Sequence, residues 1–120
     1  MPHIVFGKKI DLQKFSKRFQ PIFQKEPILI KITTVFVDKD NLTALLPSVV
    51  IVDIHQQFLI EISTSASKTT IRLYPGTDPE KTDGVKTSIA LLAKQIMCMS
   101  PEFKVTKTNL SGYLDVAVSS

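Results

Sequence analysis

The chain has 120 residues, of which 43% are hydrophobic and 22% charged, a globular composition that excludes a disordered or fibrous chain. This length suits one hydrophobic core and is too short for two, so we predict a single domain over residues 1–120. The net charge of +4 arises from 13 lysines and 2 arginines scattered along the chain, and the densest group is Lys14, Lys17 and Arg18. Nucleic-acid-binding surfaces gather their cations on one face, so the scatter argues against nucleic acid and favours small anions as partners.

The apolar segments and the cysteine content point to a cytoplasmic protein. The longest strongly apolar run, residues 49–54, contains Asp53 and is far shorter than the roughly 18 to 20 residues of a membrane span. The first residues lack the basic region, the long apolar run and the cleavage site of a signal peptide. Cys98 is the only cysteine, which excludes an internal disulfide and fits a reducing compartment. We therefore expect a cytoplasmic location and no membrane partner.

The first third of the chain predicts a strand, an amphipathic helix and a second strand. Residues 3–6 form a short apolar run, and Asp11 offers an N-cap to a segment whose apolar positions recur at helical spacing as far as Phe23. Pro21 removes a backbone donor, so we expect the helix to kink or end just before it. Residues 28–37 are rich in β-branched side chains that alternate between two faces, which predicts a strand.

The middle of the chain predicts further strands. Residues 42–46 are expected to form a short helical turn. Two extended runs follow, at 49–54 and 58–64, and they form either a hairpin or one long strand. A strand at 69–74 is then closed by a turn at Pro75 and Gly76.

The last third of the chain contains the clearest helix pattern. Asp78 and Pro79 suit a helix start, apolar residues recur at helical spacing from Val85, and Ser100 with Pro101 ends the pattern. Strands are expected at 103–108 and at 113–118.

This order of elements predicts the fold class. Two similar strand–helix–strand halves with extra strands between them indicate an α+β fold, with a mixed sheet and both helices on one face. The other face of such a sheet needs cover, which predicts a homo-oligomer.

Most common catalytic signatures are missing from the sequence. It contains no phosphate-binding loop, no dinucleotide-binding glycine motif and no nucleophile elbow. His3 and His55 have no second histidine at ligand spacing, so we predict neither a metal site nor a cofactor. Cys98 lies near the end of an amphipathic helical pattern, which favours a buried, inert thiol.

Pro2 supports a specific chemical hypothesis. If Met1 is removed, the chain begins with a secondary amine attached directly to an apolar strand. An α-amino group has a reference pKa of about 7.7 to 8.0, and loss of water around it favours the neutral base. Such a base can move protons at carbon. The alternative is that Met-Pro is a common start without a chemical role.

The N-terminal run Pro2-His3-Ile4-Val5-Phe6, the helix after it, and the strand, turn and helix at 71–97 resemble the tautomerase superfamily, including its carboxymethyl-hydroxymuconate isomerases. The closing run at 110–115 is similar to the end of an uncharacterised bacterial branch of that superfamily. The resemblance implies a trimer of two-layer β-α-β-β-α-β subunits. It also implies that an amino-terminal proline moves a proton in the keto-enol tautomerisation of a small α-keto acid.

Carried onto this chain, the resemblance assigns Pro2 as the catalytic base. Arg72, on the strand before the second helix, is the candidate for binding the substrate carboxylate, with Arg18 and Tyr113 as further substrate-binding candidates. The chain departs from the pattern at Thr77, where members often carry an arginine.

Two other functions compete with the isomerase hypothesis. The first is a non-catalytic oligomeric or partner-binding domain of the same fold that uses its extra strands at 49–64. The second is the binding of anions or nucleic acid by the cations at 14–18.

Overall fold

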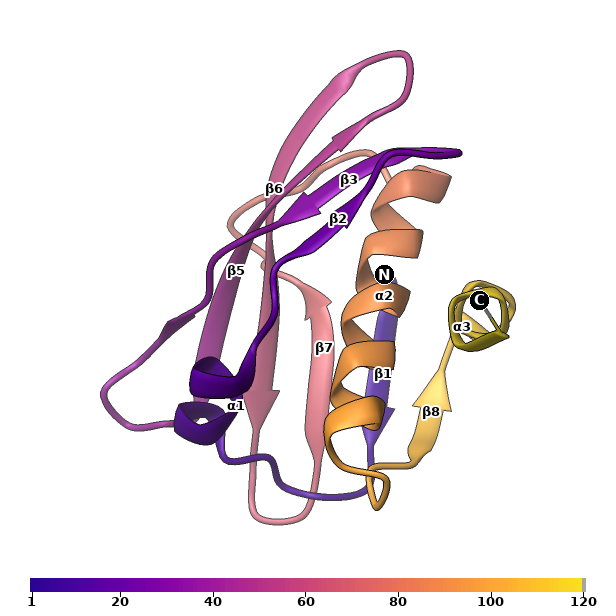
Figure 1. Cartoon of the computed structure of the whole chain (residues 1–120). Helices are drawn as coiled ribbons and strands as arrows, with labels where there is room; N and C mark the ends of the chain where they lie inside the picture. Colours follow the sequence, from indigo (N-terminus) through magenta and orange to yellow (C-terminus); the bar gives the residue numbers. More distant parts are fainter. Residues whose placement is uncertain (120) are drawn as a thin grey trace.

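In the computed structural model, which describes residues 1–119, one antiparallel sheet wraps around a long helix (Figure 1). The order of the strands across the sheet is β2-β3-β5-β6-β7-β1-β8, and β4 adds to β5. The strands are β1 (His3–Phe6), β2 (Ile22–Gln24), β3 (Leu29–Ile32), β4 (Phe36–Val37), β5 (Thr43–Ile51), β6 (His55–Thr64), β7 (Thr69–Leu73) and β8 (Val105–Thr108).

The α+β class is as predicted, but the prediction of a mixed sheet is wrong. Every pair of neighbouring strands runs antiparallel. A parallel pair of neighbours needs a crossover between them, and here the chain after β1 goes to β2 at the far edge of the sheet. Strands β7 and β8 do run parallel to each other, because each is antiparallel to β1, which lies between them.

The first helix, α1 (Leu12–Arg18), begins at the predicted cap and ends before Pro21. Asp11 Oδ1 accepts hydrogen bonds from the backbone N–H groups of Gln13 and Lys14, at 3.1 and 3.2 Å. The apolar pattern that follows the helix does not continue it. Those residues form strand β2, which pairs with β3, because extended backbone there completes the edge of the sheet.

The second helix, α2 (Asp83–Met99), starts later than the predicted Asp78 and Pro79. Thr82 is the N-cap, and its Oγ1 accepts from the N–H of Val85 at 3.3 Å. The preceding loop is held instead by Gln56, which donates to the Glu80 carbonyl at 3.1 Å. The predicted end at Ser100 is confirmed. Both α1 and α2 lie on the same side of the sheet, as predicted (Figure 1).

Residues 113–118 were expected to form a strand but belong to a third helix, α3 (Ser111–Ser119). Leu110, Leu114 and Ala117 are buried at helical spacing, and α3 packs against α2.

The prediction of a helical turn at 42–46 is also wrong, because this segment leads into strand β5, which pairs with β6. The β5–β6 unit is the hairpin alternative, with Ile51 opposite His55.

The core lies between α2 and the inner face of the sheet. Alternate strand residues such as Ile4, Phe6, Ile60 and Ile62 are fully buried there. Each fully buried side chain of this size stabilises the fold by about 1.5–3 kcal/mol relative to exposure. No helix among the described residues combines the length and apolar character needed to cross a membrane.

A glycine at the start of α2 permits the close approach of this helix to the sheet. A Cβ built on Gly84 would lie 2.3 Å from Val50 Cγ1 and 3.2 Å from Ile28 Cγ2.

We therefore expect Gly84→Ala to destabilise the protein by about 1–3 kcal/mol through overpacking, measured as a lower urea midpoint. Gly112→Ala in α3 is the matched control, because nothing lies within 4 Å of its added Cβ. The control should be neutral or stabilising by about 0.5–1 kcal/mol, and equal midpoints for the two variants would contradict this packing argument.

Candidate functional site

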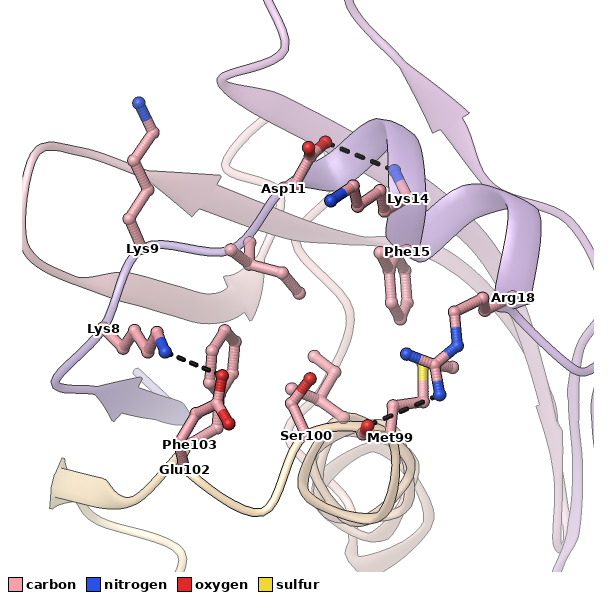
Figure 2. Close-up of a pocket in the computed structure, with 12 residues that line it drawn as sticks. Lys8, Lys9, Asp11, Lys14, Phe15, Arg18, Met99, Ser100, Glu102 and Phe103 are labelled. Carbon is pink, nitrogen blue, oxygen red and sulfur yellow. Dashed lines mark hydrogen bonds and ion pairs between the residues drawn. The ribbon is translucent and has the colours of Figure 1, made fainter.

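A pocket of about 400 Å³ lies between the loop after β1, helix α1 and the C-terminal end of α2 (Figure 2). Its floor is apolar and consists of Ile10, Phe15, Ile96 and Phe103, all of which belong to the buried core. In Figure 2 the rings of Phe15 and Phe103 lie on opposite sides of the pocket. A ligand that enters it therefore meets hydrophobic core residues at the floor.

Hydrogen bonds fix the loop that forms one wall of the pocket. Thr69 Oγ1 accepts from the N–H of Ile10 at 3.0 Å and donates to the Lys8 carbonyl at 2.8 Å. Thr69 is fully buried on β7, so the loop is tied to the sheet. The Asp11 cap then sets the start of α1, and Asn41 Nδ2 donates to the same Asp11 oxygen at 3.3 Å. These bonds place the cations of the loop and of α1 around one opening.

Cations outnumber acids around this opening. Lys8, Lys9, Lys14 and Arg18 line the pocket, whereas its only acidic lining residues are Asp11 and Glu102, which leaves an excess of two positive charges (4 − 2). Lys8 Nζ pairs with Glu102 at 2.7 Å. Within residues 1–119, the lysines at 9 and 14 form no ion pair. The pocket therefore has a positive potential that favours an anion.

The acidic groups of the pocket are held in their charged forms. The backbone hydrogen bond from Lys14, followed by the side-chain hydrogen bond from Asn41, lowers the pKa of Asp11. The hydrogen bond from Lys8 lowers the pKa of Glu102. Both carboxylates are thus ionised at neutral pH and act as fixed hydrogen-bond acceptors.

Arg18 is the one predicted site residue that lines this pocket. Its Nη2 lies 3.4 Å from the Met99 carbonyl, at the C-terminal end of α2, where a cation is favoured by the helix dipole. Figure 2 shows the guanidinium beside Ser100 and across the pocket from Lys8. Most of its N–H groups remain available to a ligand, because a guanidinium carries five donors.

Pro2 lies at the other end of β1 from this pocket. It is buried and lines a smaller cavity of about 230 Å³ together with Lys81, Lys86 and Asn109. Its nitrogen is joined to Met1 in a peptide bond, and the Met1 carbonyl accepts from Asn109 Nδ2 at 2.8 Å. The cations nearest to Pro2 in this cavity are therefore lysines.

Arg72 lies on the outer face of the sheet. It pairs in register with His3 on β1, and side chains of successive strand residues alternate between the two faces. Its Nε donates to Glu61 Oε1 at 2.8 Å, and Glu61 is only 7% exposed. Arg72 is thus occupied in a cross-strand ion pair on the face opposite to the buried Pro2.

Tyr113 lies on α3, where its hydroxyl donates to Asp83 Oδ1 at 2.5 Å. This hydrogen bond raises the pKa of Tyr113 above its usual value, so the phenol stays protonated at neutral pH. Lys86 Nζ lies 5.7 Å from the centre of the tyrosine ring. The fold therefore distributes the four predicted site residues over four separate places.

The sequence reading missed the aromatic floor of the pocket. Phe15 and Phe103 are far apart in the chain, and no local pattern joins them. The consecutive lysines at 8 and 9 were a usable signal for a basic site, because they lie in the loop just after the first strand. Cys98, expected to be buried, is exposed on α2, and no group of three metal-ligating side chains occurs among the described residues.

Comparison of the chain with protein-family models, with curated proteins and with solved structures gives no match. The resemblance to the tautomerase superfamily therefore stays a prediction.

The Asp11 cap makes a pH-dependent contribution to stability. Because folding lowers the pKa of this carboxyl, its contribution is complete above the ordinary value of 3.8 and is lost as the pH falls through the lowered pKa. We expect Asp11→Ala to lower the urea midpoint at pH 7 and to differ less from the unsubstituted protein at pH 2.5. Asp40→Ala, at an exposed position in a turn, is the matched control and should leave the midpoint unchanged at both pH values. A pH-independent loss in Asp11→Ala would contradict the assignment.

Proposed function

We propose that the pocket beside α1 binds a small organic anion with an apolar body, such as an aromatic carboxylate. The observation that carries this proposal is the combination of an apolar floor with an excess of cations at the opening. Its volume of about 400 Å³ falls within the range of small-molecule sites, roughly 300–1,000 Å³. The aromatic or aliphatic part of the ligand contacts the floor, and its charged group stays near the opening.

Each polar residue at the opening has a distinct contribution to anion binding. The planar guanidinium of Arg18 suits the two oxygens of a carboxylate. Lys14, one turn earlier on α1, adds a second charge on the same side. The Ser100 hydroxyl, which Figure 2 shows at the edge of the floor, is a further donor. All three groups line the same pocket as the phenylalanine rings.

The lining of this pocket favours binding over catalysis. It contains no histidine and no cysteine, and its two carboxylates have lowered pKa values, which makes them poor bases at neutral pH. The pocket thus supports the alternative of a non-catalytic binding domain, and the partner that it favours is a small anionic ligand.

The proposal predicts different effects for neighbouring cations of α1. Arg18→Gln and Lys14→Gln should each weaken phenylpyruvate binding about tenfold, which corresponds to about 1.4 kcal/mol for a lost charged contact, as measured by isothermal titration calorimetry. Lys17→Gln is the matched control, because Lys17 is exposed on the same helix and does not line the pocket. Added salt should weaken binding by the unsubstituted protein. Equal affinities for the Arg18 and Lys17 variants would reject the proposal.

A second candidate function is the isomerase reaction of the sequence hypothesis. We propose that Pro2, once Met1 has been removed, acts as the base in keto-enol tautomerisation of a small α-keto acid. The support comes from its cavity, because Lys81 and Lys86 line it and nearby positive charge favours the neutral form of an amine. Lys86 supplies most of this charge, since Lys81 is paired with Asp78. These lysines would take the place of Arg72 in binding the substrate carboxylate. The trimer implied by the resemblance belongs to the same proposal.

This second function is tested at the N-terminus itself. Mass spectrometry of the native protein should show that Met1 is absent, and Pro2→Ala should slow the enol-to-keto conversion of phenylpyruvate about a hundredfold, because positioned proton transfer contributes at least that much. Lys31→Gln on strand β3, outside the Pro2 cavity, is the control and should keep the full rate. Retention of Met1, or equal rates for Pro2→Ala and the unsubstituted protein, would rule this function out.

A further inference from the structure

A further cavity, of about 560 Å³, lies on the side of α2 that faces α3 and is larger than the two already described. Its walls come from three parts of the chain: α2, the segment from 109 through α3, and the turn between β2 and β3. These parts are close in space only because α3 packs against α2. The cavity shares no lining residue with the basic pocket beside α1.

The walls of this cavity are mainly apolar. Pro27 comes from the turn, Leu91 from α2, and Val116 and Ala117 from α3. Val116 is 70% exposed, so a valine side chain lies at the opening without cover from the described part of the chain. Burial of such a side chain by a ligand is favourable.

The charge of the lining distinguishes this cavity from the basic pocket. Glu26 is its only charged lining residue, and neither lysine, arginine nor histidine lines it. An organic anion would therefore meet a carboxylate and no cation, which disfavours its binding. The electrostatics of the cavity select an uncharged ligand over an anionic one.

Internal hydrogen bonds already occupy several polar side chains of the wall. Gln24 Nε2 donates to the Ile28 carbonyl at 3.0 Å, and Asn109 Oδ1 accepts from the His3 N–H at 3.0 Å. The Tyr113 hydroxyl donates to Asp83. These bonds hold the wall in place and leave these side chains few free hydrogen-bonding groups for a ligand.

Two hydroxyl groups remain for recognition. Thr87 on α2 and Ser111 at the start of α3 both line the cavity, and within residues 1–119 no protein partner is found for either hydroxyl. They offer a ligand one or two hydrogen bonds beside an apolar wall, the usual composition of a small-molecule site.

We propose that this cavity is a separate binding site for a small, uncharged, largely aromatic or alicyclic molecule with one hydrogen-bonding group. The apolar part covers Leu91 and Val116, and the polar group reaches the hydroxyls of Thr87 or Ser111. The site shares no lining residue with the anion site and only Asn109 with the Pro2 cavity. The binding argued here uses neither Pro2 nor the cations of the anion site, so either proposed function can fail without affecting it.

A fluorescence titration with N-phenyl-1-naphthylamine tests the proposal, because this dye is aromatic, uncharged and carries a single N–H donor. The unsubstituted protein should bind the dye with enhanced fluorescence that added salt does not change. Val116→Asp should weaken binding at least tenfold, because it places a carboxylate against the ligand. Val118→Asp is the matched control, since Val118 lies on the same helix, is 54% exposed and does not line the cavity. It should bind as the unsubstituted protein does.

Three outcomes would overturn the site. They are the absence of dye binding to the unsubstituted protein, equal affinities for the Val116 and Val118 variants, and a loss of dye binding in Arg18→Gln, which would place the dye in the basic pocket. Because both valines are exposed, neither substitution disturbs the core, and thermal unfolding of the two variants checks that α3 remains folded. Leu91→Gln, on the opposite wall, provides a second variant that should weaken binding without a change of charge.

Discussion

The burial of α2 against the inner face of the antiparallel sheet is the constraint on which the remaining features depend. The helix supplies an apolar face that includes Val85, Ile89 and Ile96, and the sheet wraps around this helix. The first turn of α2 therefore lies close to both β5 and the segment before β3. Close packing at this contact leaves no room for a side chain at Gly84. The position of α2 in turn determines where α1 and α3 are able to pack.

The basic pocket beside α1 and the apolar cavity beside α3 are both consequences of that arrangement. On one side, α1 meets the end of α2 and brings Arg18 to Met99. On the other side, α3 covers part of α2 through Leu114 and Ala117 and leaves Val116 at an opening. The two pockets share a central helix but differ in charge, because lysines surround the first and a single glutamate lines the second. This difference in charge is the physical basis for the two separate binding proposals.

The local patterns of the sequence predicted several elements correctly, because those elements depend on short-range interactions. The Asp11 cap is a contact between close neighbours, and the end of α2 at Ser100 follows from the proline after it. The strand at the end of the chain was predicted wrongly, because a short apolar segment carries no clear period. Its conformation as α3 depends on the presence of α2 as a packing surface.

The sequence by itself determined the α+β class, the α1 cap, the hairpin as one of two alternatives, and Arg18 as a candidate for binding an anion. These follow from composition, from spacing and from residues within a few positions of one another. Only the tertiary structure decided which cations lie together, that Arg72 faces away from Pro2, and that phenylalanines 15 and 103 line one pocket. Those facts depend on strand order and on which face of the sheet each residue occupies, and neither is encoded in a local pattern.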